Sequence, residues 1–289
     1  MKPVAFEYAD PRSVDEALDL LAEHGDDAKI LAGGQSLVPM LNFRLARPRV
    51  IVDVNRVHGL DGLREADGVL HVGALVRQRT LERWAATRAP LLAAALRVVG
   101  HVAIRTRGTV GGSIAHADPA AELPALLLCH EGGAVVRSAR GERVIDSGDF
   151  FRGPLLTALA PDELVTLTRW PLPTPSMGWG FQEVARRHGD FALTGAATLV
   201  ALEHGRIASS RIVIFGAGPT PTRASDAEKA LTGRSPTPSL FEEAGQLAAA
   251  SVEAASDIHA SAAYRRRVAA TLVSRALAEA TSRVRETTR

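Results

Sequence analysis

The sequence predicts an α+β protein with two or three compact domains, and three observations support this. The chain has 289 residues, more than a single hydrophobic core usually serves. Helix-like apolar stripes and short strand-like runs alternate along it. A segment rich in proline and glycine, PLPTPSMGWG at 171–180, interrupts them and is typical of a domain boundary. We therefore expect three parts, spanning 1–56, 57–175 and 176–289.

The first part begins with a helix whose two ends can be located in the sequence. Ser13 and Glu16 have the S-x-x-E spacing of a capping box, and Gly25 suits the C-cap. The apolar positions between them recur on one helical face: Val14, Ala17, Leu18 and Leu21. Strands AKIL (28–31) and RVIVDV (49–54) follow, so this part reads as a small α/β unit.

The second part mixes strands and helices around a polar segment. Residues 68–76 have a strand-like pattern, and residues 105–122 read as a polar loop that contains glycines. The remaining elements expected are helices near 78–86, 89–99 and 122–129 and strands near 134–139 and 162–170.

The third part is expected to hold a sheet followed by helices. Strands fall within 181–217, where ATLVALEHGRI and RIVIFGAG look like neighbours in one sheet. Helices are expected at 223–231, 238–255 and 260–284. The last helix carries Arg265, Arg266 and Arg267, which we interpret as a solvated face, with a protein partner as the second choice.

Composition and charge exclude several classes of protein. Hydrophobic residues make up 46% of the chain, yet no apolar run approaches the roughly 18 residues of a membrane span. The N-terminus, MKPVAFEYADPRS, has Glu and Asp where a signal peptide needs an apolar core, so we expect the cytoplasm. The net charge is +2 with scattered arginines and 4% aromatic residues, which argues against nucleic-acid binding.

The inventory of reactive side chains is sparse. Cys129 is the only cysteine, so no disulfide or cysteine-ligated metal cluster is expected, and we interpret it as a buried inert thiol. His116, Asp118 and Glu122 lie close together, but no second histidine stands at the spacing of helical metal ligands. No Ser/His/Asp constellation is present either, so we expect neither a metal site nor a catalytic residue.

Two glycine pairs, far apart in the chain, share a chemical pattern. The first glycine segment is Ala32-Gly33-Gly34-Gln35-Ser36, and the second is Thr109-Val110-Gly111-Gly112-Ser113. Successive amides beside glycine can converge on an anion, and a missing Cβ lets a diphosphate approach. Each pair alone is weak evidence for a phosphate site, because Gly-Gly is common in turns. Together they could clamp one dinucleotide diphosphate from both sides.

Other nucleotide motifs are missing or misleading. The chain has no G-x-x-x-x-G-K-[ST] loop. Residues 211–228 run from a strand into Gly216-x-Gly218, but Pro221 occupies the third glycine position of a dinucleotide fingerprint. We interpret that segment as a structural strand–turn–helix.

Three stretches resemble one known family. They are AGGQSLVPMLNFRLARP, IRTRGTVGGSIAHADPAAELPAL and RRHGDFAL. The sequence is similar, over nearly its whole length, to the FAD-binding medium subunits of molybdenum hydroxylases. That family includes flavoprotein subunits of carbon monoxide, nicotine and caffeine dehydrogenases and the flavin domain of xanthine dehydrogenase. The resemblance implies a two-part FAD-binding region of the p-cresol methylhydroxylase type and a smaller C-terminal α+β domain.

The resemblance also implies where non-covalent FAD binds. Its diphosphate would lie between the two glycine segments, with Asp118 on the nucleotide side, although Asp118 before Pro119 could equally cap a turn. Phe191 stands where some members have tyrosine, so the stacking face remains without the hydroxyl. Gln35 replaces the histidine of carbon monoxide dehydrogenases, which argues against CO as substrate. The cofactor-binding residues carried over are Ala32, Gly33, Gly34, Gln35, Ser36, Leu37, Ile104, Thr109, Gly111, Gly112, Ser113, Asp118, Leu164, Phe191 and either Arg186 or Arg187, of which we select Arg186.

The function implied is that of an electron-transfer subunit. Electrons from a molybdopterin large subunit would pass through an iron–sulfur small subunit to FAD and on to an external acceptor, in a dimer of heterotrimers. One alternative is a stand-alone flavin oxidase, for which the C-terminal part of about 110 residues is small. Another is a nucleotide-binding scaffold without redox activity.

Overall fold

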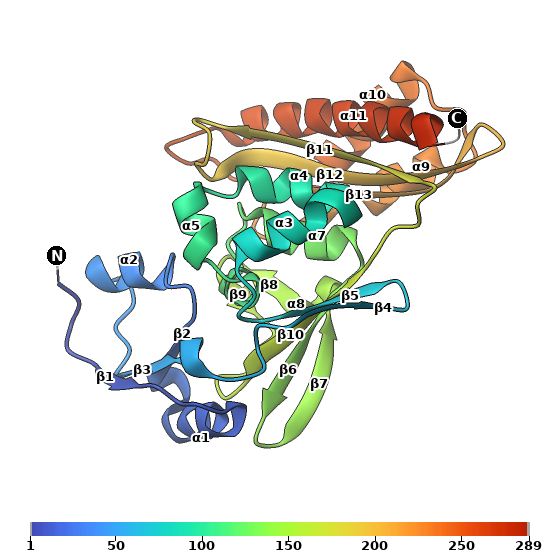
Figure 1. The fold of residues 1–289 in the computed structure, drawn as a ribbon. Helices are drawn as coiled ribbons and strands as arrows, with labels where there is room; N and C mark the ends of the chain where they lie inside the picture. Colours follow the sequence, from blue (N-terminus) through green and yellow to red (C-terminus); the bar gives the residue numbers. More distant parts are fainter. Residues whose placement is uncertain (1, 288–289) are drawn as a thin grey trace.

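Residues 2–287 are described by the computed structural model, which is elongated from the N-terminal part to the C-terminal part (Figure 1). The N-terminal part has a parallel sheet in the order β1-β3-β2, against which α1 packs. Its elements are β1 (Glu7–Ala9), α1 (Val14–His24), β2 (Ala28–Leu31), α2 (Leu37–Asn42) and β3 (Val50–Asp53), with 3₁₀ turns at Gly25–Asp27 and Val54–Arg56.

Helix α1 begins and ends where its sequence predicts. The Ser13 hydroxyl accepts a hydrogen bond from the Glu16 amide at 3.1 Å. The Glu16 carboxylate accepts from the Arg12 amide at 2.8 Å, one residue before the position that a capping box normally uses. Gly25 ends the helix with a φ of +50° and donates its amide to the Leu21 carbonyl.

The second part is built on a five-stranded antiparallel sheet in the order β4-β5-β10-β6-β7. The helices of this part lie largely between that sheet and the C-terminal part (Figure 1). Its elements are β4 (Leu63–Ala66), β5 (Val69–Gly73), α3 (Gln78–Arg88), α4 (Pro90–Val98), α5 (Val102–Arg107), α6 (Val110–His116), α7 (Glu122–Cys129), β6 (Gly133–Ser138), β7 (Gly141–Asp146), α8 (Ser147–Phe150), β8 (Phe151–Gly153), β9 (Leu156–Thr157) and β10 (Leu164–Pro171).

The prediction of a polar loop over 105–122 is wrong. Helix α5 ends at Arg107, and α6 occupies 110–116 with Thr109 as its N-cap. The glycines that suggested a loop instead permit close packing. A Cβ on Gly111 would lie 2.5 Å from the Cβ of Ala74, so only glycine lets α6 approach that residue.

The C-terminal part has a four-stranded antiparallel sheet in the order β11-β12-β13-β14. The prediction that ATLVALEHGRI and RIVIFGAG contain neighbouring strands is confirmed, because β12 pairs with β13 along most of its length. The elements are β11 (Met177–Ala185), β12 (Ala192–Glu203), β13 (Arg206–Phe215), β14 (Thr222–Arg223), α9 (Ser225–Leu231), α10 (Pro238–Ala250) and α11 (Ala262–Thr287).

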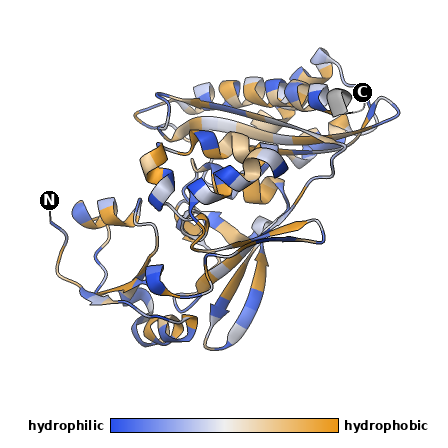
Figure 2. Cartoon of the chain, viewed as in Figure 1, coloured by the Kyte–Doolittle hydropathy of each residue, from blue (hydrophilic) through white to orange (hydrophobic). Residues whose placement is uncertain are grey.

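This last sheet is covered on both faces. Helices α10 and α11 lie on its outer face, whereas α4 and α7 of the second part pack beneath it (Figure 1). Helix α11 comes very close to β11, because a Cβ on Gly180 would lie 2.0 Å from the Ala276 carbonyl oxygen. The edge strand β7 of the five-stranded sheet carries both hydrophilic and hydrophobic residues (Figure 2), and only Ile145 in it is buried.

One hydrophobic core therefore joins the second and third parts. Leu70 and Val72 of the second part belong to the same buried cluster as Leu199 and Phe215 of the third. Residues 172–176 connect β10 to β11. The division into 1–56, 57–175 and 176–289 stays a prediction.

The interpretation of the arginine triplet as a solvated face is wrong for Arg265, which is buried. Its guanidinium donates to the carbonyl oxygens of Leu193 and Gly216 and pairs with Asp257 at 2.6 Å. These partners are remote in the chain, so the local pattern could not reveal them. The Gly216 amide in turn donates to the Pro119 carbonyl at 2.8 Å, so groups of the protein itself occupy this turn.

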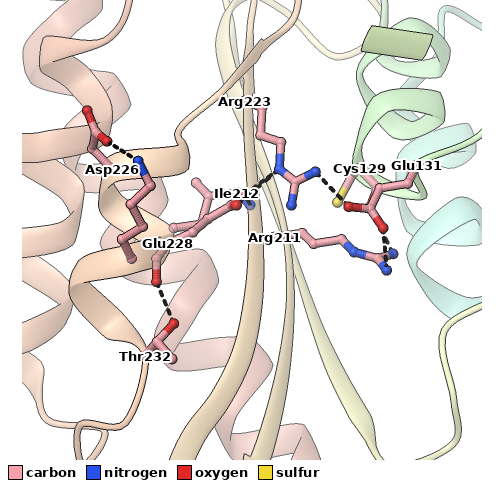
Figure 3. Close-up of polar contacts among 9 residues, drawn as sticks. Cys129, Glu131, Arg211, Ile212, Arg223, Asp226, Glu228 and Thr232 are labelled. Atoms are coloured by element: carbon pink, nitrogen blue, oxygen red, sulfur yellow. Dashed lines mark hydrogen bonds and ion pairs between the residues drawn. The ribbon is translucent and has the colours of Figure 1, made fainter. Parts of the chain in front are cut away.

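Charged side chains also hold the third part on the second (Figure 3). Glu131, just after α7, pairs with Arg211 at 2.7 Å and with Arg223 at 2.6 Å. Arg223 is fixed from the other side by Glu228 of α9, at 3.0 Å. Nearby, the predicted buried thiol is confirmed, because Cys129 is fully buried and burial raises its pKa to about 12.

Candidate dinucleotide-binding cleft

The two glycine segments, more than 70 residues apart in the chain, lie against each other. A Cβ on Gly33 would lie 2.6 Å from the Arg107 carbonyl oxygen, 2.8 Å from Gly108 Cα and 3.1 Å from the Thr109 nitrogen. A Cβ on Gly112 would lie 3.8 Å from that of Ala32. The first glycine segment thus packs against the chain that leads into α6, at a distance only glycine allows at position 33.

A cavity of about 440 Å³ opens beside this junction. Helices α2 and α5 stand on either side of it (Figure 1). Its lining residues are Leu31, Ala32, Gly33, Gly34, Gln35, Val38, Pro39, Asp53, Asn55, Ile104 and Arg107. Apolar side chains with a few convergent polar groups, at this volume, are what small-molecule and cofactor sites have.

The first glycine segment offers the cleft a row of free donors. Within residues 2–287, the backbone amides of Gly34, Gln35, Ser36 and Leu37 have no hydrogen-bond acceptor. Gly34 has a φ of +73°, which turns the chain at this corner. The Gln35 side-chain amide donates to the Gly33 carbonyl at 3.0 Å, so it stiffens the turn. Such a row of amides suits a phosphate.

The backbone amides of the second glycine segment differ from those of the first, because they have acceptors inside the protein. Its amides are already used: Gly111 donates to the Ala74 carbonyl at 2.9 Å, Gly112 to the Thr109 hydroxyl at 3.1 Å and Ser113 to the Thr109 carbonyl at 3.1 Å. In this structure the three amides are satisfied within the chain, and the first segment packs against this one. The binding of FAD by the second segment stays a prediction.

The remaining predicted residues divide between the cleft and other places. Ile104 of α5 lines the cleft. Leu164 does not, because it is 4% exposed inside the core beneath α1, with Ala17 and Leu18. Asp118 accepts a hydrogen bond from the Ala120 amide at 2.9 Å, which is the turn-capping alternative.

The loop that carries Arg186 and Phe191 joins β11 to β12 close to the start of α5. A Cβ on Gly189 in this loop would lie 2.8 Å from the His101 ring, and the His188 and His101 rings stack with centroids 6.5 Å apart. Arg186 is exposed and lies 3.9 Å from Asp190, and Phe191 is 63% exposed. Neither side chain lines the cavity itself.

Sequence reasoning missed Asp53, Asn55 and Arg107, which all line the cleft. Asp53 ends β3 and Asn55 follows it; because β3 is parallel to β2, both strands end at the edge where the first glycine segment begins. Ligands of parallel sheets bind at that edge, and this signal could have found both residues. Burial alone would raise the pKa of Asp53, but hydrogen bonds from Tyr8 and Asn55 lower it below its ordinary value.

Among the described residues, no group of three or more His, Cys, Asp or Glu side chains is placed to hold a metal ion. No helix in the same range is both long enough and apolar enough to cross a bilayer.

Comparisons with known proteins agree with the fold. The family model described as "FAD binding domain in molybdopterin dehydrogenase" matches residues 4–173, which defines the class of protein. The model described as "CO dehydrogenase flavoprotein C-terminal domain" matches residues 179–280. The chain therefore belongs to the family of FAD-binding medium subunits of molybdenum hydroxylases, which are oxidoreductases, and FAD is its cofactor.

Relatives match along the whole chain. It is 42% identical to caffeine dehydrogenase subunit beta of Pseudomonas sp. (strain CBB1), over 98% of this chain and 97% of the relative. It is 41% identical to the nicotine 6-hydroxylase medium subunit of Paenarthrobacter nicotinovorans, over 98% and 100%. The solved carbon monoxide dehydrogenase of Hydrogenophaga pseudoflava has a chain that matches with a TM-score of 0.95 and 37% identity, over 98% and 99%.

Proposed function

We propose that this chain binds FAD non-covalently in the cleft and serves as the electron-transfer subunit of a molybdenum hydroxylase complex. One observation carries the proposal: the two glycine segments pack against each other beside a cavity of about 440 Å³ that Gly33, Gly34 and Gln35 line, and the amides of residues 34–37 have no acceptor within the described chain. The shared pattern of the two segments predicts such a meeting of remote parts of the chain.

The residues of the cleft fit the parts of FAD. The diphosphate carries negative charge, and the amides of Gly34 to Leu37 are free to donate to it. The Arg107 guanidinium adds positive charge at the same cavity, and Val38 and Ile104 give apolar contact for a ring. We propose that the predicted Ser36 and Thr109 hydroxyls, Phe191 and Arg186 complete the site.

The chain's own role is to bind and orient. Bound FAD supplies the redox chemistry, because it can accept and release electrons. Electron transfer between cofactors requires no general acid or base from the protein, which fits a cleft without a catalytic cluster. Cys129 is the only cysteine and is buried, so iron–sulfur clusters must lie on another subunit.

We further propose that the partners are an iron–sulfur small subunit and a molybdopterin large subunit, assembled as a dimer of heterotrimers in the cytoplasm. Support comes from relatives whose names describe medium chains or subunits. The name of another relative, from Paenarthrobacter nicotinovorans, describes a "6-hydroxypseudooxynicotine dehydrogenase complex".

Reconstitution tests the proposal. The purified chain, mixed with FAD and passed over a desalting column, is expected to stay yellow and to release intact FAD on denaturation. Alone, it is expected to oxidise no organic substrate of the relatives. Failure to retain FAD would refute the binding role, and bleaching of the flavin by substrate in the isolated chain would show a stand-alone oxidase instead.

A further inference from the structure

The first glycine segment forms one wall of the cleft, and the chain that leads into α6 forms the other. Side-chain hydrogen bonds join these two walls at Asn55. Its Nδ2 donates to the Ala32 carbonyl at 2.7 Å, so it holds the first glycine segment from behind. Its Oδ1 accepts from Arg77 Nη2 at 2.8 Å. Asn55 thus contacts one wall through its amide nitrogen and reaches toward the other through its amide oxygen.

Arg77 completes the link on the other side. Its Nη1 donates to the Arg107 carbonyl at 2.7 Å, the same oxygen that approaches Gly33. Two nitrogens of one planar guanidinium therefore hold Asn55 and the chain before Gly108 at a fixed separation. Lysine could supply the charge but not this rigid fork.

Both ends of the link are anchored. The backbone around Arg77 belongs to the second wall, because Gln78 donates to the Gly108 carbonyl at 2.9 Å and Val110 to the Val76 carbonyl at 3.0 Å. Asn55 is held by Asp53, whose Oδ1 accepts from the Asn55 side chain at 2.6 Å. Tyr8 donates to the other Asp53 oxygen at 2.6 Å.

No other hydrogen bond or ion pair, within the described chain, connects residues 28–56 with residues 74–113. The rest of the junction is van der Waals contact at Gly33 and Gly112 and, farther from the cleft, a buried cluster in which Leu75 packs with Val52 and Val54. The Leu75 amide also donates to the Leu60 carbonyl at 2.7 Å. Within the described chain, the Asn55–Arg77 link is therefore the hydrogen bond that joins these two stretches beside the cleft. Both Asn55 and Arg77 line a second cavity, of about 280 Å³.

We propose that Asn55 and Arg77 are positioning residues, whose link sets the width of the cleft and thereby the grip on the FAD diphosphate. This proposal rests on the proposed function. It assigns a role in the site to Arg77, which lies outside both glycine segments and about 30 positions before the second segment in the chain.

The test measures FAD and ADP affinity of the full-length chain and of Asn55→Ala, Arg77→Gln and the double variant. A lost hydrogen bond to a charged group corresponds to roughly a tenfold to hundredfold weaker binding. We expect each single variant to lose about tenfold for both ligands, and the double variant to lose no more than the worse single one. Riboflavin, which lacks the diphosphate, is expected to bind all forms alike.

Arg77→Lys keeps the positive charge but removes the planar pair of nitrogen donors. The substitution is conservative enough to keep the fold. We expect it to bind FAD as weakly as Arg77→Gln, whereas wild-type affinity in Arg77→Lys would overturn the positioning role. Arg83→Gln, an exposed position on α3, is the matched control and should bind like wild type. If wild type binds no FAD, the proposed function fails; if wild type binds FAD and all variants match it, only this inference fails.

Discussion

Replacement of Gly33 by alanine should open the cleft. The new Cβ would lie 2.6 Å from the Arg107 carbonyl oxygen, about 0.8 Å short of the 3.4 Å at which ordinary contact begins. Gly108 Cα, at 2.8 Å, is also too close. All these neighbours are backbone atoms, so neither wall can relieve the clash by turning a side chain.

The free-energy cost of the Gly33→Ala substitution follows from this geometry. Overpacking against backbone typically costs about 1–3 kcal/mol, and here the strain falls on the junction of the two walls. If the walls separate, the strain is relieved but the free amides shift away from the diphosphate. A lost donor–phosphate contact of about 1.5–3 kcal/mol corresponds to roughly tenfold to hundredfold weaker FAD binding.

The assay is fluorescence titration of the apoprotein with FAD, together with urea unfolding of the ligand-free chain. Gly148→Ala is the matched control, because a Cβ there would meet nothing within 4 Å. We expect Gly33→Ala to bind FAD at least about tenfold more weakly than Gly148→Ala. Equal affinities in two folded variants would refute the conclusion that the close contact at Gly33 shapes the site.

Three further predictions concern the fold. Burial lowers the pKa of His130 from 6.5 to about 4, so between these values the unfolded chain binds a proton that the folded chain does not. The free energy of unfolding should therefore fall by about 3 kcal/mol as pH drops from 6.5 to 4. In urea titrations, His130→Gln should remove this part of the loss. A variant with the same pH profile as the wild type would contradict the prediction. Glu131→Gln removes the shared partner of Arg211 and Arg223, but Glu131 is 44% exposed, so we expect a loss of no more than about 1 kcal/mol in denaturant unfolding. A much larger loss would mean that this contact dominates the docking of the C-terminal part. The Cys129 thiol should resist iodoacetamide at pH 8 until the chain unfolds, and rapid native labelling would contradict its burial.

The sequence was most informative where local rules decide the structure. The ends of α1 follow from Ser13 and Gly25, and the order of strands and helices follows from apolar periodicity. The meeting of the two glycine segments could also be expected from their shared pattern. A resemblance to a known family supplied the cofactor.

Long-range packing decided what the sequence could not show. The glycines of the second segment indicated a loop, but Gly111 serves the contact of α6 with Ala74. Arg265 lies in a run of arginines that reads as solvated, yet its partners at Leu193 and Gly216 come from the distant sheet. Asn55 and Arg77 have no motif at all, since their role depends on a hydrogen bond between residues 22 positions apart.

A crystal structure of the chain with FAD would test the central claim most directly. It should show the diphosphate oxygens within hydrogen-bond distance of the Gly34–Leu37 amides, between α2 and α5. FAD found on another face, with those four amides turned toward solvent alone, would contradict the account.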